Sequence, residues 1–383
     1  MLLTQTTALA LDAYRDINSK KLFWITLVLS CIVVLVFVFV GINERGVVIF
    51  GNELPGFWNT TIIPASTFYM FLFVSLAIPF WLTWIATTLA LISVCGIFPD
   101  FLAGGSVDLY LSRPIGRLRL FITKYVLGLI FVAAQVLVFA IGAFVVIGLR
   151  GGQWEPKIFL AVPLVTLTFS YLFCVCVLAG VVTRSALASL LVTVVFWACL
   201  FALNSVDSIL GFVHKATELR VENQQALIDQ QGRIAAAAST TQATTRAASQ
   251  IDSLEARLPE FERQADRWRF WYRTQYALRT ILPKTNETTA LLSRWVVDRR
   301  PIRQAEQKAE ESRFLRIFGA SPTAIRTDQD GNARWPDDDQ PVMRERLDEM
   351  RQGRSTTWIV GTSVAFQAVV LSLAGFIFCR RDF

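Results

Sequence analysis

The residue types that perform catalysis are sparse in this sequence of 383 residues. The only histidine is His214, whereas an HExxH zinc site needs two histidines and a Ser–His triad needs one beside its nucleophile. No lysine follows a glycine, which excludes the GxxxxGK[ST] loop that binds nucleotide phosphates, and no GxGxxG motif occurs. We therefore expect no enzymatic activity from this chain.

Metal binding is equally poorly supported. Cys174 and Cys176 would lie roughly 200° apart around a helix, which makes them poor co-ligands and favours simple packing. The segment 327–341 spaces acidic and amide side chains like a calcium loop, but it lacks the terminal glutamate and its glycine is displaced. We expect no metal or other cofactor in the chain.

One short basic segment interrupts two long uncharged stretches. Residues 109–120 read LYLSRPIGRLRL, and neither 54–99 nor 125–149 contains Asp, Glu, Lys or Arg. Arginines in such a loop fix the orientation of neighbouring membrane spans. They can also serve as a docking surface.

The elements around this segment are membrane spans. Of all residues 54% are hydrophobic and 17% are charged, against about 45–50% and 25% in soluble domains. A helix needs about 20 apolar residues to cross a bilayer. The uncharged stretches are 22–43, 54–99, 125–149, 158–183, 185–206 and 355–379. We predict one kinked helix from about 62 to 96, because only Pro79 interrupts it; two crossings in 54–99 is the alternative. This gives an all-α membrane protein with six spans.

Short loops set the orientation of these spans. With the N-terminus inside, the cytoplasmic segments carry ten Lys and Arg residues and the outer loops carry three. The positive-inside rule therefore places both termini in the cytoplasm. No span carries an ionisable residue at mid-depth, which argues against ion-driven transport.

Three parts follow from this topology. Residues 1–213 hold spans one to five, with an interfacial amphipathic helix before the first span and a second short amphipathic helix near 100–118. Residues 214–354 form an extracytoplasmic insert, with 24 Lys and Arg and 21 Asp and Glu over 214–357. Residues 355–383 hold the sixth span and a cytoplasmic tail.

The insert is predicted to be helical and partly coiled coil. Residues 238–249 are of low complexity and predict a loop. The apolar residues that follow have the a/d spacing of a coiled coil. Pro259 should interrupt this helix, and a new helix should start there. The a/d positions are Ile251, Leu254, Leu258, Phe261, Ala265, Trp268 and Tyr272. A further helix should begin near Thr285 or Asn286 as its cap.

Aromatic and basic residues alternate in RWRFWYRTQY, at 267–276. Such a segment could stack nucleic-acid bases or a ligand. We favour the interpretation that it is an apolar helix face with solvated arginines, or an aromatic belt at the outer membrane surface. We expect no nucleic-acid partner.

The run DFLAGGSVDLYLSRPIGRLRLFITKYVLG, at 100–128, resembles the corresponding region of ABC-2 type permeases, the membrane subunits of ABC exporters. The family pattern is Gly-Ser or Gly-Thr, a hydrophobic turn, Leu-Ser-x-Pro-Ile-x-Arg, and a lysine heading the next span. The matching positions are Gly105, Ser106, Leu109, Leu111, Ser112, Pro114, Ile115, Arg117 and Lys124. The resemblance covers roughly 1–213 and 355–383.

The resemblance implies a permease in the cytoplasmic membrane, here a cell inner membrane, that exports or extracts a substrate. Its expected partners are a separate cytoplasmic ABC ATPase, which holds ATP and Mg²⁺, a second permease copy or paralogue, and the lipid bilayer. The segment expected to couple to the ATPase comprises Asp108, Leu109, Leu111, Ser112, Arg113, Pro114, Ile115 and Arg117. The alternative is a non-transporting membrane scaffold or sensor with a helical extracytoplasmic domain.

Overall fold

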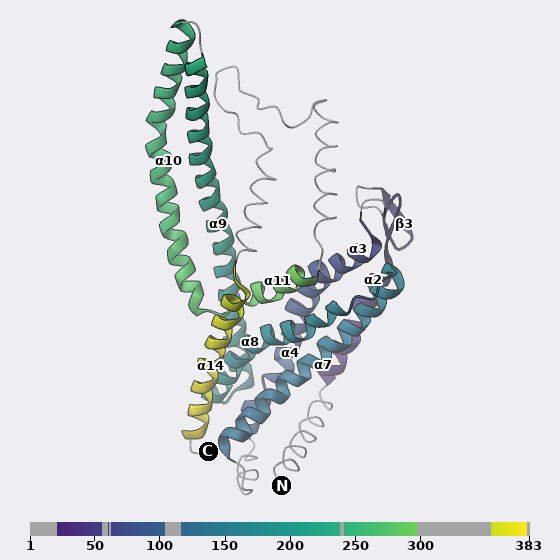
Figure 1. The fold of residues 1–383 in the computed structure, drawn as a ribbon. Helices are drawn as coiled ribbons and strands as arrows, with labels where there is room; N and C mark the ends of the chain where they lie inside the picture. Colours follow the sequence, from purple (N-terminus) through teal and green to yellow (C-terminus); the bar gives the residue numbers. More distant parts are fainter. Residues whose placement is uncertain are drawn as a thin grey trace. The chain divides into compact units, whose positions relative to one another are not determined.

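A computed structural model describes residues 21–55, 60, 63–103, 116–237, 241–296 and 354–380, which are mostly helical (Figure 1). The chain divides into two compact units. The first, which we call the bundle, comprises Met1–Ala198, Pro283–Ala324 and Thr356–Phe383. The second, which we call the hairpin, comprises Cys199–Leu282 and Ile325–Ser355.

Five helices are long and apolar enough to cross a membrane, which is compatible with a multi-pass membrane protein. They are Ala65–Leu102, Arg117–Gly151, Pro156–Thr183, Ala186–Ala236 and Thr356–Arg380. The span predicted from about 62 to 96 begins three residues before the second apolar helix. The stretches 125–149, 158–183, 185–206 and 355–379 match the other four helices, with starts that differ by at most one residue where the stretch begins first. The first predicted span, 22–43, is shorter than expected, because helix α2 runs from Lys21 to Val38 and the chain then becomes extended.

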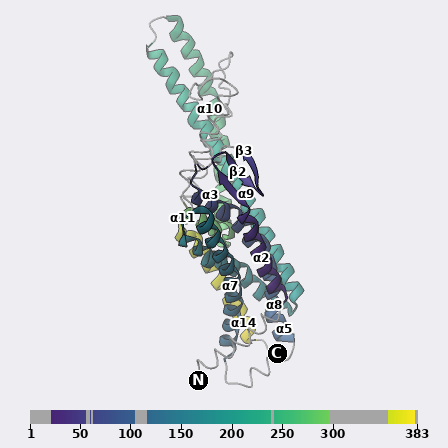
Figure 2. The ribbon, with the colours of Figure 1, turned by 90° about the vertical axis from the view of Figure 1, so that its right-hand side faces the viewer.

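A small sheet follows α2, which the all-α prediction missed. Strands β1 (Val40–Asn43), β2 (Gly46–Ile49) and β3 (Asn52–Pro55) form an antiparallel meander (Figure 2). Phe50 and Gly51 between β2 and β3 have φ angles of 49° and 84°, the two positive values that a tight hairpin turn requires. The β-branched residues of this segment suit strands better than the end of a helix.

The second apolar helix is continuous, as predicted, and Pro79 does not divide it. Its parts are α3 (Ala65–Leu72), a π-helical segment η1 (Phe73–Ala86), α4 (Thr87–Val94) and α5 (Ile97–Ala103). The wider π-helical turns accommodate the proline, and the Thr87 N–H donates to the Leu82 carbonyl five residues earlier.

The remaining bundle helices are α7 (Arg117–Gly151), η2 (Pro156–Leu160), α8 (Ala161–Thr183), the start of α9 (Ala186–Ala237) and α14 (Thr356–Arg380). α8 supplies many of the fully buried side chains, among them Phe169, Tyr171 and Phe173.

Side-chain contacts fix the directions of these helices. α2 and α7 run parallel, since the Phe23 and Phe131 rings are in contact with their centres 4.8 Å apart and Arg150 donates to the Val38 carbonyl at 2.6 Å. α8 runs antiparallel to α7, since Tyr125 stacks on Phe173 and Phe144 contacts Phe159. The bundle therefore has one end near Ala103, Arg117 and Cys379, and an opposite end near the sheet.

The hairpin consists of the part of α9 beyond Cys199 and the antiparallel helix α10 (Thr241–Ile281). Two bonds set its register: Gln224 Nε2 donates to the Leu254 carbonyl and Gln275 Nε2 to the Leu203 carbonyl, both at 3.1 Å.

Two predictions about the hairpin were wrong. The loop predicted over 238–249 is shorter, because α10 already begins at Thr241. No new helix begins at Pro259, which lies inside α10. Its neighbours Glu255 and Glu260 are exposed, so water can reach the carbonyl that loses its partner. Except for Trp268, the predicted a/d positions are half-buried or buried.

A short helix, α11 (Thr285–Val296), follows α10 and confirms the helix predicted there. Its cap differs from the prediction, because Thr285 is already helical and Lys284 precedes the helix. Thr288, Leu291 and Leu292 are fully or almost fully buried, and α11 packs against α8 and η1. Its contacts therefore group it with the bundle, although the sequence suggested that it belongs to the insert.

Candidate functional site

The first candidate site lies at the bundle end where α5, α7 and α14 meet; we call it the α5–α7–α14 junction. Its centre is a group of four buried aromatic rings from the three helices. Phe121 of α7 lies 5.2 Å from Phe98 and 5.6 Å from Phe378, between ring centres, and Phe101 lies 6.4 Å from Phe378. These rings fasten the end of α5 to the start of α7 and the end of α14.

Cations surround this aromatic group. Arg117 Nη1 donates to the Cys379 carbonyl at 3.2 Å, near the C-terminus of α14. A cation is favourable there because the last carbonyls of a helix have no helical partner and carry partial negative charge. Lys124 Nζ lies 5.6 Å from the centre of the Phe101 ring. Both residues were singled out from the sequence, and the structure brings them to one place.

The rest of the predicted coupling segment lies outside the described residues. These positions are Asp108, Leu109, Leu111, Ser112, Arg113, Pro114 and Ile115. One boundary of the helix predicted near 100–118 changes, because Arg117 is the first residue of α7, with the extended Gly116 as its cap. Residues 100–103 belong to α5. The junction thus holds the two ends of segment 104–115.

The opposite end of the bundle buries a lysine that the sequence analysis did not single out. Lys284 is 2% exposed, its Nζ donates to Thr362 Oγ1 at 2.6 Å, and it lies 4.1 Å from the centre of the Trp358 ring. Its backbone N–H donates to Ser363 Oγ at 3.0 Å. A buried ammonium group needs such partners because burial removes its hydration. The buried lysine ties the start of α11 to α14.

Between the two ends, neutral polar groups link three helices. Gln367 Nε2 of α14 donates to the Tyr125 hydroxyl of α7 at 3.0 Å. That hydroxyl donates to the Ser170 carbonyl of α8 at 3.2 Å, and Ser170 Oγ donates to Gln367 Oε1 at 2.9 Å. The ring of bonds satisfies each group without a charge, which suits an apolar surrounding. A second glutamine of the bundle, Gln135 of α7, is also buried, and its Nε2 has no hydrogen-bond partner among the described residues.

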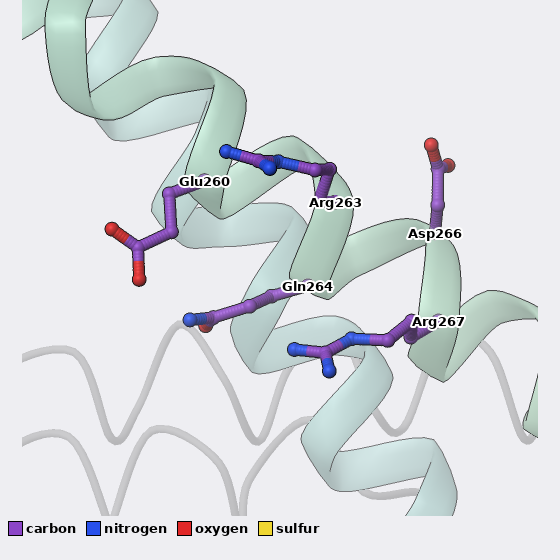
Figure 3. A pocket seen from close by; sticks show the side chains of 5 residues that line it. All are labelled: Glu260, Arg263, Gln264, Asp266 and Arg267. Atoms are coloured by element: carbon purple, nitrogen blue, oxygen red, sulfur yellow. The ribbon is translucent and has the colours of Figure 1, made fainter.

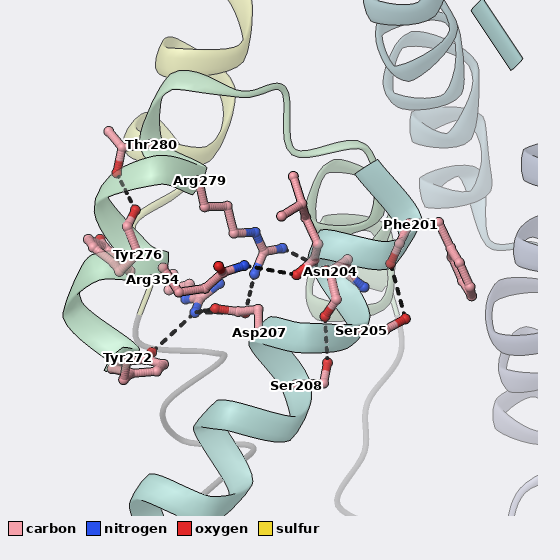
Figure 4. Close-up of polar contacts among 12 residues, drawn as sticks. Phe201, Asn204, Ser205, Asp207, Ser208, Tyr272, Tyr276, Arg279, Thr280 and Arg354 are labelled. Carbon is pink, nitrogen blue, oxygen red and sulfur yellow. Dashed lines mark hydrogen bonds and ion pairs between the residues drawn. The ribbon is translucent and has the colours of Figure 1, made fainter. Parts of the chain in front are cut away.

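The hairpin has a charged cluster of its own (Figure 4). Asp207 of α9 pairs with Arg279 of α10 and with Arg354, whose Nη2 lies 3.2 Å from Asp207 Oδ2. Arg279 Nη2 also donates to Asn204 Oδ1 at 2.7 Å, and Arg354 Nη2 to the Tyr272 hydroxyl at 3.3 Å. All three charged side chains are about nine-tenths buried. One carboxylate between two guanidinium groups joins both helices to the residue just before α14.

A second polar cluster surrounds the single histidine. His214 stacks on Tyr272 at 5.2 Å between ring centres, and its Nε2 lies 3.4 Å from Glu218 Oε1. Burial lowers the pKa of His214 more than the nearby Glu218 carboxylate raises it. Burial alone would raise the pKa of Glu218, but the hydrogen bond from Lys215 and the surrounding cations hold it below its usual value.

A hollow of about 500 Å³ lies along the outer part of α10 (Figure 3). Its described lining consists of Glu260, Arg263, Gln264, Asp266 and Arg267. Side chains of both charges alternate along one helix, and they are largely exposed. This arrangement is typical of a solvated helix surface and supplies no catalytic pair.

Comparison with known proteins identifies no family for the chain. No protein family, no curated protein and no solved structure matches it. The observations that bear on function are the junction, the buried polar groups and the sequence resemblance.

Proposed function

We propose that this chain is the permease subunit of an ABC-2 type transporter in the cytoplasmic membrane. In this proposal α2, the helix Ala65–Leu102, α7, α8, α9 and α14 are the six spans, and both termini lie in the cytoplasm. A separate ATPase binds ATP and Mg²⁺ and docks on the segment from Asp108 to Arg117. A second permease copy or paralogue completes the transporter, which exports or extracts its substrate.

The observation that carries this proposal is the α5–α7–α14 junction. Segment 104–115 begins where α5 ends and stops where α7 begins, and Arg117 bonds to the end of α14. A force applied to this segment would therefore reach three helices through one buried aromatic group. A motor that closes on the cytoplasmic side needs such a connection to move the spans.

The directions of the helices support the same topology. Successive bundle helices alternate, so that the ends of α5 and α14 and the start of α7 share one side. By the positive-inside rule this side faces the cytoplasm, where Arg117, Arg119, Lys124 and Arg380 lie. The bonds inside the bundle between Tyr125, Ser170 and Gln367 are neutral, which favours an external energy source over ion coupling.

The test is the ATPase activity of a reconstituted complex. The chain is co-expressed with a candidate ABC ATPase, identified by a GxxxxGK[ST] motif in an adjacent reading frame, purified with it and placed in nanodiscs. The variants Arg113→Glu and Arg117→Glu should insert normally and co-purify less ATPase, and their stimulated ATPase activity should fall to that of the ATPase alone. Arg117→Lys should keep part of the activity, because it keeps a donor to the Cys379 carbonyl.

Arg45→Glu is the matched control, since Arg45 is exposed in the turn between β1 and β2 and pairs only weakly with Glu53. It should leave stimulation unchanged. Full stimulation in both Arg113→Glu and Arg117→Glu would contradict the proposal. Failure of the unsubstituted chain to bind or stimulate an ATPase would favour the alternative of a scaffold or sensor, in which the hairpin is the functional part.

A further inference from the structure

Most of the large apolar side chains exposed on the described part of the hairpin lie at one level, which we call the foot: residues 203–214 of α9 and 268–281 of α10. Phe201 and Ile234 are exposed outside it. Soluble surfaces rarely gather such residues into a patch. The most exposed members are Ile209 (62%), Phe212 (50%), Phe270 (64%), Trp271 (58%), Leu278 (51%) and Ile281 (69%), and Val206 and Trp268 are less exposed. Farther along α10, the exposed residues near the hollow are charged.

Contacts within the hairpin place the α9 part and the α10 part of the foot at the same height along the hairpin. Gln275 bonds to the Leu203 carbonyl, Arg279 pairs with Asp207, and Tyr272 stacks on His214. The apolar positions of α10 therefore lie beside residues 203–214 of α9. The charged groups of the Asp207 cluster pair with one another and are about nine-tenths buried, so they are not part of the exposed surface of the foot (Figure 4).

The position along α9 places the foot at a membrane boundary. α9 is one uninterrupted helix, and its stretch 185–206 is the predicted fifth span. At 1.5 Å per residue, Ile209 and Phe212 lie about 4.5 and 9 Å beyond residue 206. The headgroup layer on each side of the hydrocarbon core is about 5–8 Å thick. The foot thus lies where tryptophan and tyrosine side chains concentrate in membrane proteins.

The charge of the foot fits the same surface. Residues 267–281 contain four arginines and no acidic residue. Arg279 is buried in the Asp207 cluster, whereas Arg267, Arg269 and Arg273 are exposed. Arginines beside an aromatic belt can bury their methylene groups in the interface and bind lipid phosphates with their guanidinium groups.

We propose that the foot of the hairpin binds the surface of the bilayer leaflet from which α9 emerges. Phe270, Trp271, Leu278 and Ile281 of α10 lie among the upper acyl chains and glycerol groups, and Arg267 and Arg273 bind the phosphates above them. α10 is then anchored to lipid along its last three turns, although it does not cross the membrane. The proposal requires α9 to cross a bilayer, but it does not require ATP-driven transport.

The test measures what surrounds individual positions of α10 in the full-length protein. Trp271→Cys and Leu278→Cys are labelled with an environment-sensitive fluorophore in nanodiscs of phosphatidylcholine and phosphatidylglycerol. Arg263→Cys, exposed on the same helix two turns farther from the foot, is the control. The unsubstituted protein gives the background from the native cysteines.

Positions 271 and 278 should emit at shorter wavelength than position 263. Lipids carrying a nitroxide on the acyl chain should quench positions 271 and 278, and aqueous iodide should quench position 263. Quenching of all three positions by iodide alone would overturn the proposal. Protection of positions 271 and 278 from both quenchers would also overturn it, because protein would then cover the foot. Neither outcome alters the ATPase test of Arg113 and Arg117.

Discussion

Buried polar groups are paired by neutral hydrogen bonds in the centre of the bundle and by opposite charges in the hairpin. In the bundle, Tyr125, Ser170 and Gln367 satisfy one another without a charge. In the hairpin, Asp207 is shared by two buried arginines. Breaking a neutral hydrogen bond costs little free energy, whereas leaving a buried charge unpaired costs several kcal/mol. The polar contacts of the bundle can therefore rearrange at a small free-energy cost, whereas separating α9 from α10 at the foot of the hairpin costs much more.

The largest expected effect therefore comes from Asp207→Asn. It leaves two arginines buried without their carboxylate and should destabilise the hairpin by about 3–5 kcal/mol. Hydrogen exchange of the full-length protein should accelerate in 203–214 and 268–281. Asp252→Asn, at an exposed position of α10, is the control and should leave exchange unchanged. Equal exchange rates of 203–214 and 268–281 in Asp207→Asn and Asp252→Asn would show that the pairs of Asp207 with the two arginines do not stabilise the hairpin.

Lys284 tests the exception, because it is a charged group buried in the bundle. Lys284→Met keeps most of the packing and removes the charged donor to Thr362, which should cost about 1.5–3 kcal/mol. The measurement is the midpoint of thermal unfolding in detergent, with the exposed Lys157→Met as control. A midpoint equal to that of the control would show that this lysine contributes nothing to holding α11 on α14.

The neutral bonds of the bundle should yield a smaller effect. Tyr125→Phe removes one hydroxyl, and a hydrogen bond between membrane helices contributes about 0.6 kcal/mol and at most about 1.7. A double-mutant cycle with Gln367→Leu, read from the same unfolding midpoints, isolates the bond between the two side chains. A coupling energy as large as the effect of Asp207→Asn would show that the neutral bonds of the bundle stabilise it as much as the charged pairs stabilise the hairpin.

The smallest effect is a pH dependence confined to the hairpin. The pKa of His214 is lowered, so the folded chain binds fewer protons than the unfolded one near pH 6, and stability should fall as the pH drops below about 6.5. Lys215, Arg269 and Arg273 oppose its protonation, while Glu218 stays ionised in this range because its pKa is also lowered. The measurement is the hydrogen-exchange protection factor of residues 208–220 at pH 5 and pH 7.5, which is corrected for the intrinsic increase of amide exchange with pH.

His214→Gln is the decisive variant, since the chain has no other histidine. It should abolish the difference between the two pH values. A difference that persists in this variant would assign the dependence to another group.

The sequence predicts the apolar helices well, because the absence of charge over some 20 residues is a strong and local signal. It predicts the small sheet and the course of α10 poorly. Residues 39–42 are as apolar as the end of a span, and the residues beyond them, with Glu44, Arg45 and the turn at Phe50 and Gly51, have the composition of an ordinary loop. Pro259 normally ends a helix, but an exposed position lets water replace the lost bond. Both errors concern features that depend on solvent rather than on pattern.

The candidate site was predictable in part. The basic segment identified Arg117 and Lys124, and both lie at the α5–α7–α14 junction. The aromatic rings beside them carry no sequence signal, because Phe98, Phe121 and Phe378 come from three distant helices. Lys284 was missed for a similar reason: a lysine after a proline in a charged insert gives no sign that α14 covers it.

Photocrosslinking from Ser112 tests the central claim most directly. A photoreactive amino acid replaces Ser112 in the full-length protein in intact cells, and a second one replaces Trp154, which is exposed at the opposite end of the bundle. We predict that position 112, but not position 154, crosslinks to a protein that contains a GxxxxGK[ST] motif. A position 112 that crosslinks only to lipid, or to no ATPase, would contradict the account.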